Sequence, residues 1–261
     1  MSIKNPNWYA VLGIRVANTN ISLFIDSVLS AIDEVENYCI SASGAHGIIS
    51  SRKDKELFKI LNSFECNLPD GQPSVWIAKI KGAKKIQRCF GPFVFAEMMK
   101  ATSRLNLNHY FCGGKRGVAE QLVVSCKKKF YNDNVVGTYS PPFRELSEND
   151  IKMIAMDINA KNTAILWIGI STPKQEILAK RLSKYINVKY IFTVGAAFDY
   201  YTDSIKIAPS WVQKAGLEWL FRLFLEPKRL WKRYFEIVPK FLFFGILDLF
   251  GLYKHPFERI K

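Results

Sequence analysis

Residues 163–194 read TAILWIGISTPKQEILAKRLSKYINVKYIFTV, and this stretch decides the fold. Two apolar runs, 163–168 (TAILWI) and 188–194 (VKYIFTV), flank a glycine-bearing turn and a helical segment at 177–185. A strand, a helix and a second strand in this order are typical of a parallel sheet, because the helix returns the chain to the end at which the first strand began. We therefore predict an α/β fold with a Rossmann-like parallel sheet and helices on both faces.

The same alternation continues outward from this stretch. Residues 109–112 (HYFC) lead into GGKRG and a helical run at 118–130, and 134–136 lead into GTYSPPF. The first hundred residues are less regular, and we expect a helix at 21–35, a strand at 38–43 and a helix at 54–61. No low-complexity linker is visible. We predict a closely packed N-terminal lobe (1–100), a Rossmann-like lobe (101–210) and a C-terminal amphipathic helical appendage (211–261).

The composition fits a globular protein with a strongly basic surface. Hydrophobic residues make up 49% of the 261 residues, and 37 Lys and Arg against 23 Asp and Glu give a formal net charge of +14. Such a charge attracts polyanions, so nucleic acid, anionic lipid and nucleotide-sugar phosphates are candidate partners. A well-solvated basic surface without such a partner is the simpler alternative. Five scattered cysteines without a C-x-x-C pair favour a reducing compartment.

No segment has the pattern of a targeting or membrane-spanning element. The first residues, MSIKNPNWYAVLGIRV, lack the basic start, apolar run and cleavage site of a signal peptide. The longest apolar run, 241–253 (FLFFGILDLFGLY), contains Asp248 and is shorter than the ~20 residues that cross a bilayer. We therefore expect a cytoplasmic protein without a transmembrane helix.

From Trp211 onward, aromatic and basic residues interleave. Glu226 and Pro227 predict a helix boundary, with proline in the first turn of the new helix. On that helix one side carries Lys228, Arg229, Lys232 and Arg233, and the other carries Trp231, Tyr234, Phe235 and Val238. A core-facing helix with a solvated basic side fits this pattern. The apolar run that follows favours the other interpretation, an amphipathic helix on a membrane surface.

Two glycine-bearing turns are candidate phosphate sites. Residues 113–117 (GGKRG) lie between a strand and a helix, whose free N–H groups and positive dipole end attract anions. They match neither the P-loop nor the dinucleotide fingerprint, so a tight connection is the alternative. In 171–176 (STPKQE), Thr172 as N-cap, Pro173 and Gln175 form a capping box, while Lys174 and Gln175 are also candidate ligand donors.

Asp70 and His46 are the candidate acid–base groups. Asp70 lies in NLPDGQP, where Asp-Gly after proline is ordinary turn chemistry, yet an isolated loop carboxylate also suits a general base for a sugar hydroxyl. His46, in SGAHG, is either a ligand group or a structural histidine. The sequence has no D-x-D pair and no metal-ligand spacing of His, Cys, Asp and Glu. We therefore expect no metal and no cofactor, with phosphate charge met by Arg, Lys and helix N-termini.

Nine segments, in order through nearly the whole chain, resemble the WecG/TagA/CpsF glycosyltransferases of bacterial surface-polysaccharide synthesis. They are VLGIRV, SGAHGIISSRKDKEL, PDGQPSVW, the GP of CFGPFVF, YFCGGKRGVAEQL, VVGTYSPPF, GISTPKQE, VGAAFDYY and APSWVQKAGLEWLFRLFLEPKRLWKRY. The last segment is the most specific, with GLEW, then an arginine, then EP-x-R-L-W-x-R-Y.

This resemblance implies an inverting, metal-independent transfer of a hexose-type sugar from a UDP-sugar to a sugar on undecaprenyl diphosphate. It places the enzyme on the anionic inner face of the plasma membrane, without nucleic acid as a partner and with a homo-oligomer left open. The family's proposed base falls on Asp70. Its nucleotide pocket and C-terminal arginines, with His46 added as a ligand group, imply the substrate-binding set His46, Gly113, Gly114, Gly117, Tyr139, Gln175, Asp199, Arg222, Arg229 and Arg233.

The chain departs from the family pattern at three positions. Ile207 stands where many members carry arginine, Asp203 where many carry glycine, and Gly44 where many carry asparagine, so the donor sugar stays open. A basic nucleic-acid-binding protein would use the same Lys and Arg excess and aromatic residues. A nicotinamide-dependent oxidoreductase would share the fold class, but the fingerprint glycines are missing. Basic residues beside an apolar tail favour the membrane enzyme over the nucleic-acid binder.

Overall fold

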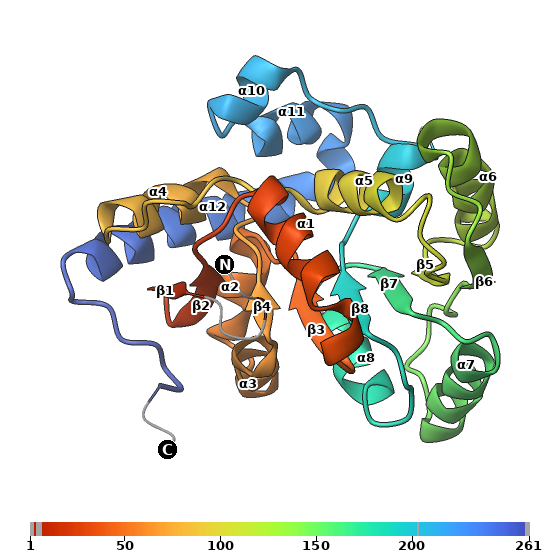
Figure 1. Cartoon of the computed structure of the whole chain (residues 1–261). Helices are drawn as coiled ribbons and strands as arrows, with labels where there is room; N and C mark the ends of the chain where they lie inside the picture. The colour runs from red at the N-terminus through yellow and green to blue at the C-terminus, as the bar shows by residue number, and fades with distance from the viewer. Residues whose placement is uncertain (1–2, 4–6, 203, 259–261) are drawn as a thin grey trace.

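The computed structural model describes residue 3 and residues 7–202 and 204–258. Its centre is a six-stranded parallel sheet with the strand order β4-β3-β8-β7-β5-β6 (Figure 1). The strands are β3 (Tyr38–Ser41), β4 (Cys66–Asn67), β5 (His109–Gly113), β6 (Val135–Tyr139), β7 (Ile165–Gly169) and β8 (Tyr190–Thr193). The parallel sheet predicted from residues 163–194 is confirmed, and β7 and β8 are its central neighbours.

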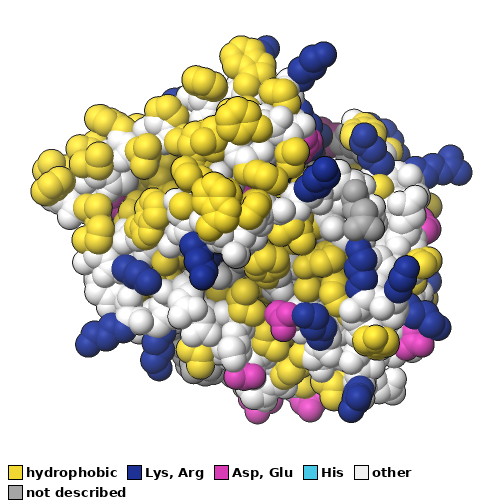
Figure 2. Space-filling model, turned by 90° about the horizontal axis from the view of Figure 1, so that it is seen from above, with side chains coloured by type: hydrophobic (Ala, Val, Ile, Leu, Met, Phe, Trp, Pro, Cys, Tyr) yellow, Lys and Arg dark blue, Asp and Glu magenta, His cyan; other side chains and the backbone are white. Residues whose placement is uncertain are grey.

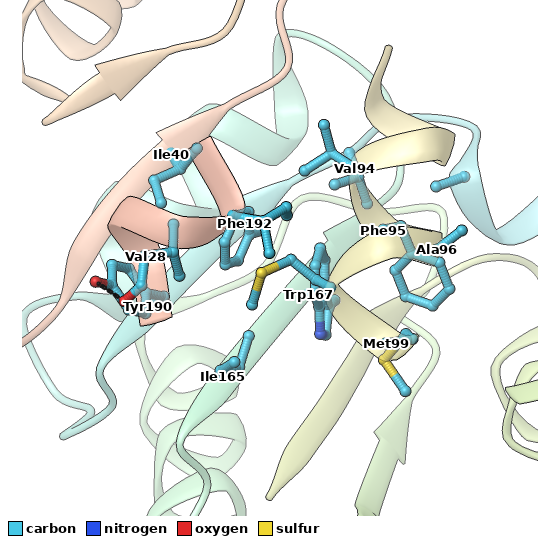
Figure 3. Packing of buried hydrophobic residues seen from close by; sticks show 14 of the residues in the cluster. Val28, Ile40, Val94, Phe95, Ala96, Met99, Ile165, Trp167, Tyr190 and Phe192 are labelled. Atoms are coloured by element: carbon cyan, nitrogen blue, oxygen red, sulfur yellow. Dashed lines mark hydrogen bonds between the residues drawn. The ribbon is translucent and has the colours of Figure 1, made fainter. Parts of the chain in front are cut away.

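Helices cover both faces of this sheet, because successive strand side chains point to opposite faces and both sets are apolar. One face packs on α1 (Ile21–Ser30), α5 (Gly91–Ala101), α6 (Val118–Phe130) and α9 (Ala197–Tyr201). The other face packs on α3 (Lys55–Ser63), α7 (Glu148–Ala160) and α8 (Lys174–Leu182). On the first face, Trp167 stacks on Phe192 at 4.4 Å and meets Phe95 of α5 edge-on at 4.9 Å (Figure 3).

Element boundaries in the first hundred residues differ slightly from the prediction. The helix expected at 21–35 ends at Ser30, where Ala31 leaves helical geometry with φ −108°, and a 3-10 turn, η1 (Ile32–Glu34), follows. The strand expected at 38–43 ends at Ser41. Asp54 does not begin the next helix but caps it, because its carboxylate accepts the N–H of Leu57 at 2.9 Å.

A third apolar cluster joins the two ends of the chain. It contains the antiparallel hairpin of β1 (Trp8–Val11) and β2 (Ile14–Ala17), with α2 (Ala45–Ser51), α4 (Gln72–Ile80) and α12 (Pro227–Leu249). Ile237 and Phe241 of α12 are buried in it. Asp248 accepts the N–H of Leu12 at 3.0 Å and pairs with Lys81 at 2.7 Å. The second half of α12 is therefore part of the body of the protein.

The remaining C-terminal elements are α10 (Ser210–Lys214) and α11 (Glu218–Leu225), which lie beside the first half of α12 (Figure 1). The helix boundary predicted at Glu226-Pro227 is confirmed, since α12 begins at Pro227. Strands from residues 38–67 and 109–193 share one sheet, and the division into lobes at residue 100 stays a prediction. Among the described residues, no helix is both long enough and apolar enough to cross a membrane.

Candidate functional site

A cavity of about 870 Å³ lies beyond the carboxyl ends of β3, β7 and β8. The loops after these strands form one wall, and side chains of α11 and α12 form another. The carboxyl ends of parallel strands are where ligands bind in doubly wound sheets, and the volume suits a small-molecule site. The sheet topology therefore explains where the cavity lies.

The structure brings most of the predicted site residues to this cavity. Its lining includes Asp70, His46, Gly114, Gln175, Asp199, Arg222, Arg229 and Arg233. Three other predicted residues, all in the described part of the chain, lie outside the lining: Gly113, Gly117 and Tyr139. Tyr139 packs against the apolar cluster under α7 and α8.

Gly113 and Gly117 set the backbone geometry of the GGKRG turn next to the cavity. A Cβ on Gly113 would lie 2.4 Å from the carbonyl oxygen of Gly169, so only glycine allows β5 and β7 to approach this closely. Gly117 is the N-cap of α6 with φ +89°, a left-handed conformation that favours glycine. Gly114 and Lys115 between them are the residues of the turn that reach the cavity.

Asp70 lies in the loop that precedes α4, and hydrogen bonds hold both its carboxylate and its backbone. Its Oδ1 accepts the N–H of Gly91 at 2.9 Å, and its backbone oxygen accepts Nε of Arg88 at 2.7 Å. Its Oδ2 lies on the side of Gly44, 3.1 Å from where a Cβ would stand. Burial raises the pKa of Asp70 to about 6, against the opposing effect of the Arg88 guanidinium. At neutral pH the carboxylate is ionised and more basic than an exposed one.

Arg88 and Glu218 belong to the site although the sequence analysis did not single them out. The guanidinium of Arg88 pairs with Glu218 of α11 at 2.6 Å, and both side chains are largely buried. Glu218 also accepts the hydroxyl of Tyr200 at 3.1 Å. Arg88 thus connects the backbone of Asp70 to α11. Glu218 stands in the GLEW motif, which was a usable signal, whereas nothing in its spacing marked Arg88.

Gln175 lines the cavity, but its amide is occupied by internal hydrogen bonds. Its Oε1 accepts the N–H groups of Gly195 at 3.0 Å and Ser171 at 3.4 Å, and its Nε2 donates to Glu176 at 2.9 Å and to Thr172 at 3.4 Å. These bonds join the loops that follow β7 and β8. Gln175 therefore shapes this wall, and its amide has little capacity left for a ligand.

The capping box predicted for Thr172 is wrong. The N-cap of α8 is Pro173, which makes no side-chain hydrogen bond. The Thr172 hydroxyl instead donates to the buried Glu176 carboxylate at 2.9 Å, so it is directed into the protein and away from the helix terminus. Burial raises the pKa of Glu176.

Cationic side chains dominate the charge of the cavity. They are Arg88, Lys115, Arg144, Lys174, Arg181, Arg222, Arg229 and Arg233, against the carboxylates of Asp70, Glu145, Asp199 and Glu218. Burial, and the neighbouring Arg229 and Arg222, lower the pKa of Arg233. Burial, and then Arg233, lower the pKa of His46 to about 4. His46 is therefore a neutral imidazole at pH 7, and the cavity favours an anionic ligand.

Comparison of the amino-acid sequence with known proteins identifies the family of this chain. The model of the "Glycosyl transferase WecG/TagA/CpsF family" matches residues 9–255. The chain belongs to this family. An N-acetylglucosaminyldiphosphoundecaprenol N-acetyl-beta-D-mannosaminyltransferase of Bacillus subtilis (strain 168) is 28% identical over 236 residues, which cover 87% of each chain. As a member of the WecG/TagA/CpsF family the chain is a glycosyltransferase, and the cavity is its candidate active site.

Among the residues that the structure describes, no group of three or more His, Cys, Asp and Glu side chains is arranged to hold a metal ion. The positive charge of the cavity wall comes from Lys and Arg side chains. These fixed cations are the groups of this chain that can face a phosphate.

Proposed function

We propose that this glycosyltransferase moves a hexose-type sugar from a UDP-sugar to a sugar on undecaprenyl diphosphate, with inversion and without a metal ion. One observation carries the proposal: a rigidly held carboxylate, Asp70, shares a cavity with a cluster of arginines. The name of the Bacillus subtilis relative describes transfer of N-acetylmannosamine to an N-acetylglucosaminyl diphosphoundecaprenol. A similar pair of substrates would present both a sugar hydroxyl and diphosphate groups to this cavity.

The reaction is a single displacement in this proposal. Asp70 takes the proton of the acceptor hydroxyl while the hydroxyl oxygen forms a bond to the anomeric carbon of the donor. The bond from that carbon to the UDP oxygen breaks on the opposite side, so the configuration inverts. A pKa of about 6 suits this role, because Asp70 is ionised at pH 7 and still basic enough to accept a proton.

The departing UDP needs positive charge, which α11 and α12 supply. Arg222, Arg229 and Arg233 line the cavity together with Lys115 from the glycine turn. Glu226 holds Arg229 through two contacts, 2.6 Å to Nε and 2.8 Å to one terminal nitrogen, so this side chain is oriented before a ligand binds. Donors oriented in advance stabilise developing charge without reorganisation during the reaction.

We also propose that the C-terminal helices bind the anionic inner face of the plasma membrane. Figure 2 shows hydrophobic side chains over a broad area of the face on which α10 and α11 lie. Large exposed apolar residues of the C-terminal elements include Trp211, Phe224 (76% exposed), Phe235 (71%), Phe243 and Phe250. Trp231 and Phe235 face solvent, while Tyr234 and Val238 of the same predicted aromatic side line the cavity, so this side is divided between solvent and the cavity. Exposed Lys228 and Lys232 would each gain ~1 kcal/mol near anionic lipid.

A transfer assay tests the reaction. The purified protein is incubated with a panel of UDP-sugars and a synthetic acceptor that carries N-acetylglucosamine on a lipid diphosphate, and the product is analysed by mass spectrometry and by NMR of the new anomeric centre. We expect one UDP-sugar to be transferred with inverted configuration. Retention of configuration would overturn the single displacement. Transfer from none of the UDP-sugars would overturn the donor assignment.

A further inference from the structure

The wall that α12 contributes to the cavity changes character along the helix. Arg229 and Arg233 line it first, and Ile237, Val238, Phe241 and Leu242 line it further on. From Arg233 to Leu242 the helix rises roughly 13 Å at ~1.5 Å per residue. The cavity is thus cationic at one end of this wall and apolar at the other. A ligand that matches it has an anionic head joined to a hydrocarbon chain.

The apolar part of the cavity reaches the protein surface. Leu242 lines the cavity and is also 52% exposed. Pro73 of α4 and Gly216, in the turn between α10 and α11, also line the cavity, and Gly216 lies against Gln72 and Trp76 of α4. We call the set Pro73, Gly216, Val238, Phe241 and Leu242 the apolar mouth. Because Leu242 is half-exposed on α12, the apolar mouth opens to solvent at one of the helices that we propose to bind the membrane.

Close packing fixes the two sides of the apolar mouth. A Cβ on Gly245 would lie 2.9 Å from Cδ1 of Ile77, so glycine lets α12 lie directly against α4. The half-exposed ring of Trp76 reaches the turn above, 3.1 Å from where a Cβ of Gly216 would stand. The side chains of the apolar mouth are therefore positioned by α4 and by the α10–α11 turn as well as by α12.

A second part of the cavity lining, also partly exposed, carries charged side chains among apolar ones. Arg144 and Glu145 follow β6 beside Pro141, Pro142, Phe143 and Leu146, and Lys174 and Arg181 come from α8 beside Ile177 and Leu178. The five residues of the apolar mouth include no charged side chain. The apolar mouth is therefore the part of the cavity in which hydrocarbon would be removed from water without displacing a charged group.

We propose that the apolar mouth binds the first prenyl units of the lipid-linked acceptor, next to its diphosphate. This rests on the proposed function, since it assumes an acceptor with a polyprenyl diphosphate. A chain held here leaves the membrane between α4 and α12 and presents its diphosphate to the arginines of α12. The acceptor sugar then extends toward Asp70, which lies in the loop directly before α4.

Kinetics with two acceptors test the proposal. Both carry the same sugar diphosphate, one on a long prenyl chain and one on a short alkyl chain that is soluble in water, and both are assayed in detergent so that membrane binding does not contribute. Leu242→Asp is compared with Ile246→Asp, because Ile246 is 55% exposed on the same helix and lies outside the cavity lining. We expect Leu242→Asp to lower kcat/KM for the long-chain acceptor at least tenfold more than Ile246→Asp. For the short-chain acceptor the two variants should agree within about twofold.

If the two variants lower kcat/KM for the long-chain acceptor equally, the proposal is overturned. Transfer by the wild-type protein would still support the proposed function in that case. If the wild-type protein transfers sugar to neither acceptor, the proposed function itself is refuted. A prenyl diphosphate with a photoreactive group in its first units gives a measurement independent of folding defects. Crosslinks to residues 238–242 are expected, and crosslinks confined to residues 141–146 would overturn the proposal.

Discussion

The two walls of the cavity differ in what their polar side chains contact. On the sheet side, the side-chain amide of Gln175 is hydrogen-bonded to Gly195, Ser171, Thr172 and Glu176. These bonds hold the loops of this wall together. On the helical side, Arg222, Arg229 and Arg233 line the cavity. Glu218 is the buried residue of α11, and the large apolar side chains around it are partly or fully exposed. The sheet wall supplies geometry, and the helical wall supplies charge and a surface.

Asp70 belongs structurally to the sheet side but is coupled to the helical side. Its carboxylate is fixed by Gly91, while Arg88 ties its backbone to Glu218 of α11. Breaking a buried ion pair by removing one partner is expensive, which makes this pair an anchor for α11. Substitutions on the sheet side should therefore mainly affect the chemical step. Substitutions on the helical side should affect either phosphate binding or membrane binding, depending on the residue.

The largest effect should come from Asp70→Asn. The amide cannot accept the proton, so turnover should fall by at least ~100-fold, the lower range for a lost general base. UDP binding, measured by calorimetry, should stay near that of the wild type. Burial raises the pKa of Asp70, so its ionised form is unfavourable in the folded state at pH 7, and the variant should melt no lower than the wild type. Asp33→Asn, on an exposed turn, is the control. Near-normal turnover of Asp70→Asn would remove Asp70 from the catalytic role.

The next effect separates the two roles of the helical wall. Arg222→Ala and Arg229→Ala should each lower transfer by roughly 10- to 100-fold, because a charged hydrogen bond contributes ~1.5–3 kcal/mol. Lys228→Ala and Lys232→Ala, which are exposed on the same stretch, should instead weaken flotation with anionic liposomes and leave transfer to a soluble acceptor unchanged. If both pairs of variants change flotation and transfer in parallel, α11 and α12 do not divide these roles.

A smaller effect should appear in the pH profile. With a pKa of about 6, Asp70 becomes protonated as the pH falls, so kcat/KM should decline by about tenfold per pH unit below pH 6. Near neutral pH the rate should be level with respect to this group. The residual activity of Asp70→Asn should lack this acidic limb. A wild-type profile that stays flat down to pH 4.5 would show that Asp70 is not the base.

The sequence predicted the parallel sheet better than the contacts of single side chains, for physical reasons. Strand runs such as 163–168 are apolar on both faces, and parallel order then places the residues that follow them at one edge. Gln175 follows such a run and lines the cavity, whereas Asp70 and His46, which line it too, were selected as loop residues and from the family resemblance. The direction of a side chain was not predictable: Gln175 and Thr172 point into internal hydrogen bonds that depend on Gly195 and Glu176.

Long-range pairing accounts for what the sequence analysis missed. Arg88 acquires its role from Glu218, which is 130 positions away and comes close only when α11 packs over the strand ends. The periodicity of α12 fitted either a core helix or a surface helix, and the structure shows both. Leu230, Ile237 and Phe241 are buried along one side of the helix, and Trp231, Phe235, Leu242 and Ile246 are exposed along another. The periodicity does not specify which elements cover the buried side, because the N-terminal hairpin and α2 come from the other end of the chain.

The smallest expected effect is that of chelation. If α11, α12 and the glycine turn supply the positive charge for the departing UDP, an added divalent ion has no necessary role, and EDTA should change the rate by less than about twofold. Treatment with EDTA also distinguishes the two walls, because a metal ion would have to be held by carboxylates such as Asp70 and Asp199, which are on the sheet side. A clear loss with EDTA that Mg²⁺ or Mn²⁺ restores would move the leaving-group charge to that wall. In that case the arginine variants should lose little activity when Mg²⁺ is saturating, so measuring them with and without the ion decides which wall stabilises the diphosphate.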